Sequence, residues 1–188
     1  MTVPTFDCSF SHSWTAEILP NRPMILPSRH FVYPGAVEEV ERGALEVLVQ
    51  PAIGQSFLAT CALGFRDPAA PTGIWACPDP DWICAVSGGY MYLIHSGKPE
   101  EFVMLRYRPV LEILPYSADP ANKLLLFVGH HSILAWGRDG ETWESDRLSW
   151  EGITNLRIED NLLRGDGWNL RTDKDLPFVL DLRTGKRI

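Results

Sequence analysis

Residues 82–95 read WICAVSGGYMYLIH, two apolar runs of six residues on either side of a glycine pair. Runs of this length that are rich in aromatic and β-branched residues, and that are bounded by turn residues, predict β-strands. The pair Gly88-Gly89 predicts a tight two-residue turn, because glycine readily adopts the positive φ that such turns require. The stretch therefore predicts an antiparallel hairpin, and it sets the pattern for most of the chain.

The same alternation of short apolar runs and turn residues continues from Ala44 to the last residues of the sequence. Turn signals lie at Gly88-Gly89, Asp139-Gly140, Asp160-Asn161 and Thr184-Gly185. Strands are expected near residues 44–50, 57–65, 73–77, 82–87, 90–96, 101–107, 110–115, 124–129, 132–137, 141–146, 153–158, 161–165 and 176–182. Short strands with regular turns predict an all-β protein, built as a single-domain antiparallel meander, sandwich or barrel.

An internal repeat offers an alternative all-β architecture. When the chain is shifted by 42 residues, the apolar segment 82–86 falls on 124–128, and 91–93 falls on 133–135. Both copies consist of an apolar strand, a turn and a second apolar strand. A period of about 40–45 residues is typical of four-stranded propeller blades, so a small propeller-like repeat is the alternative.

Residues 1–28 form a Pro-rich leader that differs in composition from the rest of the chain. Its prolines exclude a long helix, and its apolar side chains are too numerous for a free tail. We therefore expect this leader to be docked on an all-β domain that spans residues 29–188. One short helix is expected near residues 35–43, where GAVEEVERG places two valines on one face and three glutamates opposite.

The charge balance bears on partners and location. The chain has 188 residues with 17 Lys and Arg against 24 Asp and Glu, a formal net charge of −7 at pH 7. This acidic balance argues against nucleic acids and membrane surfaces as partners, because both attract positively charged proteins. The first residues lack the basic start and apolar run of a secretory signal, so we expect a cytoplasmic protein.

The sequence has four cysteines: Cys8, Cys61, Cys77 and Cys84. No two of them form a C-x-x-C motif, which argues against a zinc knuckle or a redox motif. Cys61 and Cys84 lie in apolar runs, and we expect buried thiols there. The adjacent His130 and His131 invite a metal hypothesis, but neighbouring side chains of a strand point to opposite faces. Neither a metal nor a cofactor is expected.

Tryptophans are the first candidates for a binding surface. Indole rings can stack on sugars or anchor peptides, although they can equally fill a thin β core. The predicted aromatic surface consists of Trp82, Trp136, Trp143 and Trp150.

An acidic loop is the alternative site. Asp79 and Asp81 flank Pro80 just before Trp82, and glycoside hydrolysis requires two carboxyl groups on either side of a sugar. Asp is also common in ordinary turns, which is the simpler explanation.

Nucleophile and phosphate-binding motifs are absent: the sequence contains neither a G-x-S-x-G elbow nor a Walker loop. The aromatic residues without a catalytic motif favour a non-catalytic binding or protein-interaction module, whose partner is a protein or a small-molecule ligand. The alternative is a hydrolase that acts on a glycan or a small substrate.

Overall fold

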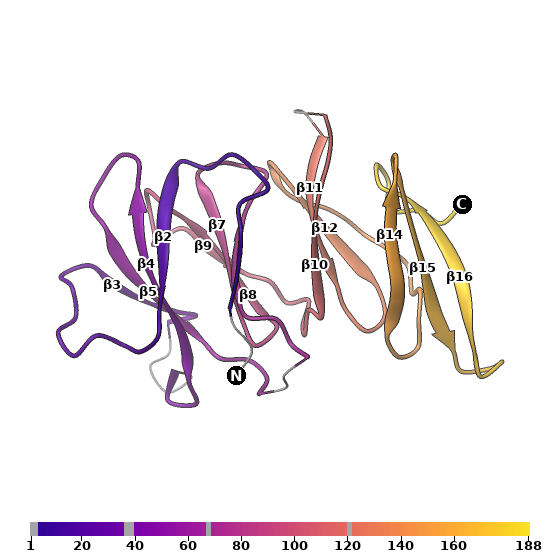
Figure 1. The fold of residues 1–188 in the computed structure, drawn as a ribbon, viewed down its shortest axis with the longest axis horizontal. Coiled ribbons are helices and arrows are strands. Elements are labelled where there is room, and N and C mark those ends of the chain that lie inside the picture. Colours follow the sequence, from indigo (N-terminus) through magenta and orange to yellow (C-terminus); the bar gives the residue numbers. More distant parts are fainter. Residues whose placement is uncertain (1–3, 36–39, 67–68, 120–121) are drawn as a thin grey trace. The chain divides into compact units, whose positions relative to one another are not determined.

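The computed structural model describes residues 4–35, 40–66, 69–119 and 122–188. The sixteen elements that these residues form are all β-strands, which confirms the predicted all-β class (Figure 1). The contacts between residues divide the chain into unit 1, Met1–Pro109, and unit 2, Val110–Ile188. In the described part of the chain, no helix is long and apolar enough to cross a membrane.

The first sheet of unit 1 has the strand order β2-β4-β5-β3. Strand β4 pairs antiparallel with both β2 and β5, whereas β3 runs parallel to β5. The bounds are β2 (Trp14–Leu19), β3 (His30–Tyr33), β4 (Ala44–Pro51) and β5 (Phe57–Ala62).

The second sheet of unit 1 has the order β1-β6-β7-β8-β9, in which β6 to β9 form an antiparallel meander and β1 runs parallel to β6. Its strands are β1 (Thr5–Asp7), β6 (Gly73–Ala76), β7 (Trp82–Ser87), β8 (Tyr90–His95) and β9 (Phe102–Met104). The hairpin predicted from residues 82–95 is β7-β8, and its turn residues Gly88 and Gly89 have φ values of +56° and +75°.

Strands β5 and β7 explain why the sequence shows apolar runs rather than alternation. Every residue of β5 is buried, as is every residue of β7 except Trp82, so side chains on both faces of these strands are excluded from water. Strands buried on both faces are continuously apolar. Two buried tyrosines also connect unit 1 internally: the Tyr33 hydroxyl donates to the Pro99 carbonyl, and the Tyr92 hydroxyl donates to the Ala62 carbonyl.

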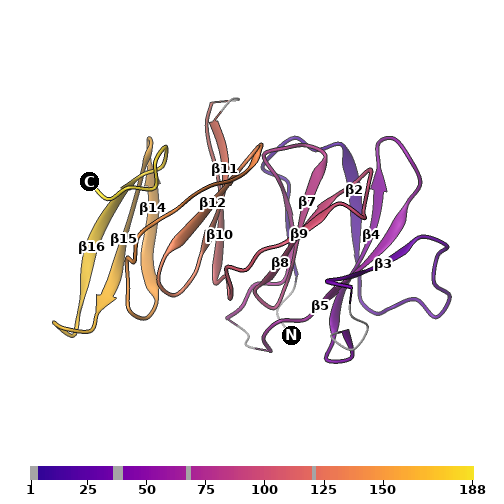
Figure 2. The same cartoon turned by 180° about the vertical axis from the view of Figure 1, so that it is seen from behind.

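Unit 2 contains a four-stranded antiparallel sheet, β10-β11-β12-β13, and a three-stranded antiparallel sheet, β14-β15-β16 (Figure 2). The bounds are β10 (Glu112–Asp119), β11 (Asn122–Val128), β12 (Ile133–Gly137), β13 (Gly140–Glu144), β14 (Ile153–Glu159), β15 (Leu162–Asn169) and β16 (Lys174–Asp181). A single hydrophobic cluster joins these two sheets, with Leu126 and Trp143 from the first and Leu163, Phe178 and Leu180 from the second.

The expected strands from residue 44 onward all correspond to observed strands, with bounds that differ by a few residues. The four sheets that the described residues form are open, so they are meanders or sandwich layers rather than barrels. The 42-residue shift relates the consecutive meanders β6–β9 and β10–β13: it places β7 on β11 and β8 on β12. In the propeller-like alternative, each of these two four-stranded meanders would correspond to one blade.

The leader contains structure that the sequence analysis did not predict. Strands β1 and β2 lie within residues 1–28, where β1 pairs with β6 and β2 pairs with β4. Periodicity failed to reveal them because prolines interrupt the pattern around them. The domain boundary at residue 28 stays a prediction, and the helix expected near 35–43 falls largely on residues 36–39, which lie outside the described residues.

A chain of polar side chains crosses the first sheet of unit 1. The Arg22 Nε donates to Glu46 Oε1 over 2.7 Å, and the Thr60 hydroxyl donates to Glu46 Oε2 over 2.5 Å. The Thr60 oxygen in turn lies 2.8 Å from His30 Nε2. Because Glu46 is only 5% exposed, its carboxylate depends on these partners.

Replacing Glu46 by alanine is expected to lower the free energy of unfolding by about 2–4 kcal/mol, because it leaves Arg22 and the buried Thr60 without their shared acceptor. Urea denaturation followed by tryptophan fluorescence measures the change. The matched control is Glu17→Ala on β2, where the side chain is exposed and a change within about 0.5 kcal/mol is expected. Equal unfolding midpoints for the two variants would contradict the structural role of Glu46.

Candidate functional site

A cleft within unit 2 lies where several turns meet, and its volume is about 1000 Å³. Every second turn of an antiparallel meander lies at the same end of the sheet, because consecutive strands reverse direction. In unit 2, the β12-β13 turn of one sheet and the β14-β15 turn of the other both line the cleft, together with the end of β10 and the C-terminal turn. We call this the turn-end cleft; it is lined by Tyr116, Ser117, Ala118, Asn122, Lys123, Leu124, residues 137–142, Asp160, Asn161, Leu182 and Arg183.

Tyr116 joins the two sides of the turn-end cleft. Its side chain comes from β10 and is 7% exposed, and its hydroxyl donates to Asn161 Oδ1 over 2.5 Å. This bond occupies the carbonyl oxygen of the Asn161 amide and leaves its nitrogen as a donor toward a ligand. Leu124 and Leu182 also line the cleft, but they are 9% and 0% exposed and belong with Tyr116 to the hydrophobic core.

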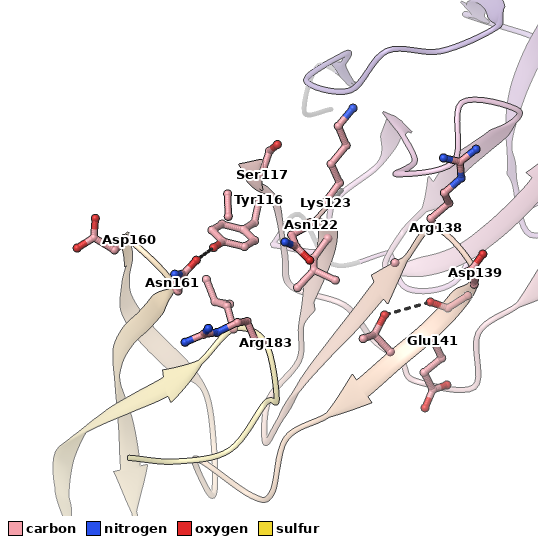
Figure 3. Close-up of a pocket in the computed structure, with 16 residues that line it drawn as sticks. Tyr116, Ser117, Asn122, Lys123, Arg138, Asp139, Glu141, Asp160, Asn161 and Arg183 are labelled. Carbon is pink, nitrogen blue, oxygen red and sulfur yellow. Dashed lines mark hydrogen bonds between the residues drawn. The ribbon is translucent and has the colours of Figure 1, made fainter. Parts of the chain in front are cut away.

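Charged side chains surround this partly apolar centre. Figure 3 shows Asp160 and Asn161 on one side of the cleft, Arg138, Asp139 and Glu141 on the other, and Tyr116, Asn122 and Lys123 between them. The described lining contains three cationic side chains (Lys123, Arg138 and Arg183) and three anionic ones (Asp139, Glu141 and Asp160), so its formal charges balance.

Several of these charges are available to a ligand. The side chains of Arg138, Asp139 and Glu141 are exposed and make no hydrogen bond or ion pair with other residues that the structure describes. Arg183 lies 3.5 Å from Asp181, but this pair is largely open to water and contributes little. The turn-end cleft can therefore offer both charged donors and charged acceptors at once.

The described lining residues of the turn-end cleft include neither a histidine nor a cysteine. Among the described residues, no group of three or more His, Cys, Asp or Glu side chains is arranged to hold a metal ion.

The aromatic surface expected from the sequence is only partly exposed. Trp136 and Trp143 are 9% and 8% exposed, and the Trp143 indole donates to the Leu182 carbonyl over 2.9 Å. These two rings are therefore core side chains, which corrects their expected place on an exposed surface. Trp150 is 40% exposed beneath the Arg147 guanidinium, and Trp82 in unit 1 is partly exposed beside His95. None of the four lines the turn-end cleft.

The two carboxylates of the acidic loop have different roles. Asp79 Oδ1 accepts a hydrogen bond from the backbone nitrogen of Asp81 over 2.9 Å, the local turn for which aspartate is favoured. Asp81 instead lines a small cavity in unit 1, which Asp79 does not line. The pair therefore does not face a shared cleft as glycoside hydrolysis would require.

His130 and His131 are both exposed in the turn that leads into β12. Their ring centroids lie 6.0 Å apart. The two residues form a turn rather than part of a strand, so the expectation that their side chains point to opposite faces of a strand does not apply. Their backbone carbonyls accept hydrogen bonds from Gly152 and from Leu148 and Ser149, so the turn anchors the segment that follows β13.

The four cysteines are free thiols, of which Cys8 is exposed and the other three are buried. Burial raises the pKa of Cys61, Cys77 and Cys84, which keeps these thiols protonated and unreactive at neutral pH.

Sequence reasoning missed the turn-end cleft although it identified the turns that form it. Asp139-Gly140 and Asp160-Asn161 were recognised as turn signals, and both pairs line the cleft. What the sequence did not indicate is that two different sheets bring these turns, and Tyr116 and Arg183, around one cleft.

Comparison with known proteins adds no family: no protein-family model matches this chain, and no curated protein shows significant sequence similarity to it.

The different environments of two tryptophans can be tested by truncation. Trp143→Ala is expected to lower the free energy of unfolding of unit 2 by about 3–5 kcal/mol, because it opens a cavity in the core and removes the bond to Leu182. Trp150→Ala is expected to change it by less than about 1 kcal/mol. Guanidinium denaturation of both variants checks this, and similar losses would show that Trp150 is also part of the core.

Thiol titration tests the burial of the cysteines. In the native protein, an aromatic disulfide reagent is expected to modify only Cys8, and the other three thiols are expected to react after denaturation. Partial burial and then the neighbouring Asp7 raise the pKa of Cys8, so its reaction should be slow near neutral pH and accelerate as the pH rises. Native modification of more than one thiol would contradict this arrangement.

Proposed function

We propose that this chain is a non-catalytic ligand-binding module whose binding site is the turn-end cleft of unit 2. The single observation that supports this most is a cleft of about 1000 Å³ whose described charged side chains balance, with Arg138, Asp139 and Glu141 in no ion pair with another described residue. Unpaired charges of both signs around a partly apolar centre suit recognition by hydrogen bonds and ion pairs.

The lining favours a polar ligand that carries both charges. A purely anionic ligand would meet Asp139, Glu141 and Asp160, and a purely cationic ligand would meet Lys123 and Arg138. A zwitterion or a short charged peptide can place each charge opposite its complement, which lowers the cost of desolvating both partners. Tyr116 and Leu124 are 7% and 9% exposed, so they offer only a small apolar contact to the aliphatic part of such a ligand.

A glycan is a less suitable ligand for this cleft. Among the described lining residues Tyr116 is the one aromatic side chain, and it is 7% exposed, so it offers little surface on which a sugar could stack. The alternative of a glycan hydrolase has correspondingly less support. The carboxylates of Asp139 and Glu141 are exposed, whereas a catalytic acid is usually held in an environment that retains its proton.

The location and partners inferred from the sequence remain part of this proposal. The net charge of −7 disfavours nucleic acid and anionic membranes as ligands, and the balanced cleft adds no basic patch that would reverse this. Binding of a small polar solute or of a charged protein segment in the cytoplasm is consistent with both observations.

Titration of the ¹⁵N-labelled chain with small probes tests the proposal. The Arg-Glu dipeptide is expected to shift amide resonances of residues 116–118, 122–124, 137–142 and 160–161, whereas maltose, inorganic phosphate and spermidine are expected to cause smaller shifts. The double variant Arg138→Ala with Glu141→Ala is expected to weaken dipeptide binding at least about fivefold, the loss of roughly 1 kcal/mol.

A matched double variant controls for loss of charge alone. Arg171→Ala with Glu151→Ala removes the same two charges from exposed positions of unit 2 outside the cleft, and it should leave the affinity unchanged. The proposal is wrong if none of the probes shifts the cleft resonances, or if both double variants bind the dipeptide equally.

A further inference from the structure

A second, smaller cavity lies within unit 1 and has a volume of about 210 Å³. The loop before β2, the β4-β5 loop, the start of β7 and the end of β8 surround it. One wall is apolar and consists of Pro51, Ala52 and Ile53, and the other is polar and includes Ser13, Asp81 and His95. We call it the unit-1 cavity.

The carboxylate of Asp81 is held in place by its neighbours. Ser13 donates its hydroxyl to Asp81 Oδ1 over 2.5 Å, and the backbone of Asp81 bonds to Asp79 on one side and Ser96 on the other. Ser13 is fixed in turn, because its backbone nitrogen donates to the Pro80 carbonyl over 2.9 Å and its carbonyl accepts from Ala52 over 2.6 Å. Asp81 is exposed, so a ligand can reach it, and these bonds reduce the conformational freedom that its carboxylate loses on binding.

This carboxylate has no cationic partner. None of the ion pairs among the described residues includes Asp81, and Lys98, close by in sequence to His95, is paired with Glu101. Ser13 occupies only one of the two carboxylate oxygens, so Oδ2 keeps its capacity to accept hydrogen bonds.

His95 does not convert this arrangement into a catalytic centre. Its Nδ1 accepts a hydrogen bond from the backbone nitrogen of Gly97 over 3.1 Å. The Ser13 hydroxyl lies within hydrogen-bond distance of Asp81 Oδ1 and of the Pro80 carbonyl, and among the described residues it makes no bond to His95. The ring packs edge-on against Trp82 at 5.5 Å, which fixes its orientation as a wall of the cavity.

The apolar wall determines which chemical group a ligand can carry next to its charged end. Ile53 lines the cavity and is 89% exposed, so a ligand that binds there can cover part of its aliphatic side chain. A ligand that extends from Asp81 toward Ile53 would need a charged end and a short aliphatic part.

We propose that the unit-1 cavity binds a cationic head group, a primary ammonium or a guanidinium, carried on a short aliphatic chain. The fixed carboxylate of Asp81 and the Ser13 oxygen accept hydrogen bonds from the cation, and Pro51, Ala52 and Ile53 contact the chain. A free amine and the side chain of a lysine or an arginine share this chemistry. The unit-1 cavity and the turn-end cleft share no lining residue, so a test of this proposal is independent of the function proposed for unit 2.

Titrations of the ¹⁵N-labelled full chain with matched probes test this site. n-Butylammonium and n-butylguanidinium are expected to shift resonances of residues 13, 52–53, 81 and 95–97, whereas n-butanol and butyrate, of similar size, are not. N-acetyl-lysine methylamide is the probe for a peptide side chain, and tighter binding than n-butylammonium would identify that source. Equal shifts with n-butanol would reduce the cavity to an apolar surface and overturn the proposal.

A pair of isosteric variants isolates the charge. Asp81→Asn is expected to weaken n-butylammonium binding at least tenfold, whereas Asp79→Asn removes an equal charge two residues away, preserves an acceptor for its turn and should leave binding unchanged. Equal affinities for the two variants would refute the role of Asp81. Should Asp81→Asn fail to fold, the selectivity of the unsubstituted chain for n-butylammonium over n-butanol decides the matter.

Discussion

Pairing between strands that are neighbours in the sequence is the constraint on which the rest of this structure depends. In β10 to β13 each strand forms its hydrogen bonds with the strand before it, and the same holds in β6 to β9 and in β14 to β16. Backbone groups that leave water must find partners, and a short turn places the next strand within reach at little entropic cost. Each meander can therefore form from a continuous stretch of about 30 residues.

Pairing between consecutive strands also determines at which end of a sheet each turn lies, and so where the turn-end cleft forms. Strand reversal brings every second turn to the same end, where polar residues are tolerated because they reach water. In unit 2 the two sheets share one hydrophobic cluster, and this packing brings the turns of both sheets around Tyr116. The turn-end cleft is thus a consequence of two meanders packed face to face.

Trp143 shows how the core also shapes this surface. Its indole bonds to the Leu182 carbonyl and contacts the turn at Gly185, where a Cβ would lie 2.4 Å from the ring. Gly185 has φ of +68°, so both the available space and the backbone conformation require glycine. Trp143, which the sequence analysis placed on an exposed surface, is therefore a core residue, and its hydrogen bond positions Leu182 at the edge of the cleft.

The sequence by itself determined the fold class and nearly every strand after Ala44, because apolar runs and turn residues are local signals. It also indicated the turn pairs Asp139-Gly140 and Asp160-Asn161. It did not reveal β1 and β2 between the prolines, since such short strands are stabilised by distant partners rather than by their own composition. Only the tertiary structure decided that Trp136 and Trp143 are buried, that Asp79 and Asp81 have separate roles, and which charges line one cleft. These outcomes depend on packing between sheets and on hydrogen bonds between residues far apart in the chain, such as Ser13 to Asp81 and Tyr116 to Asn161, which no local pattern encodes.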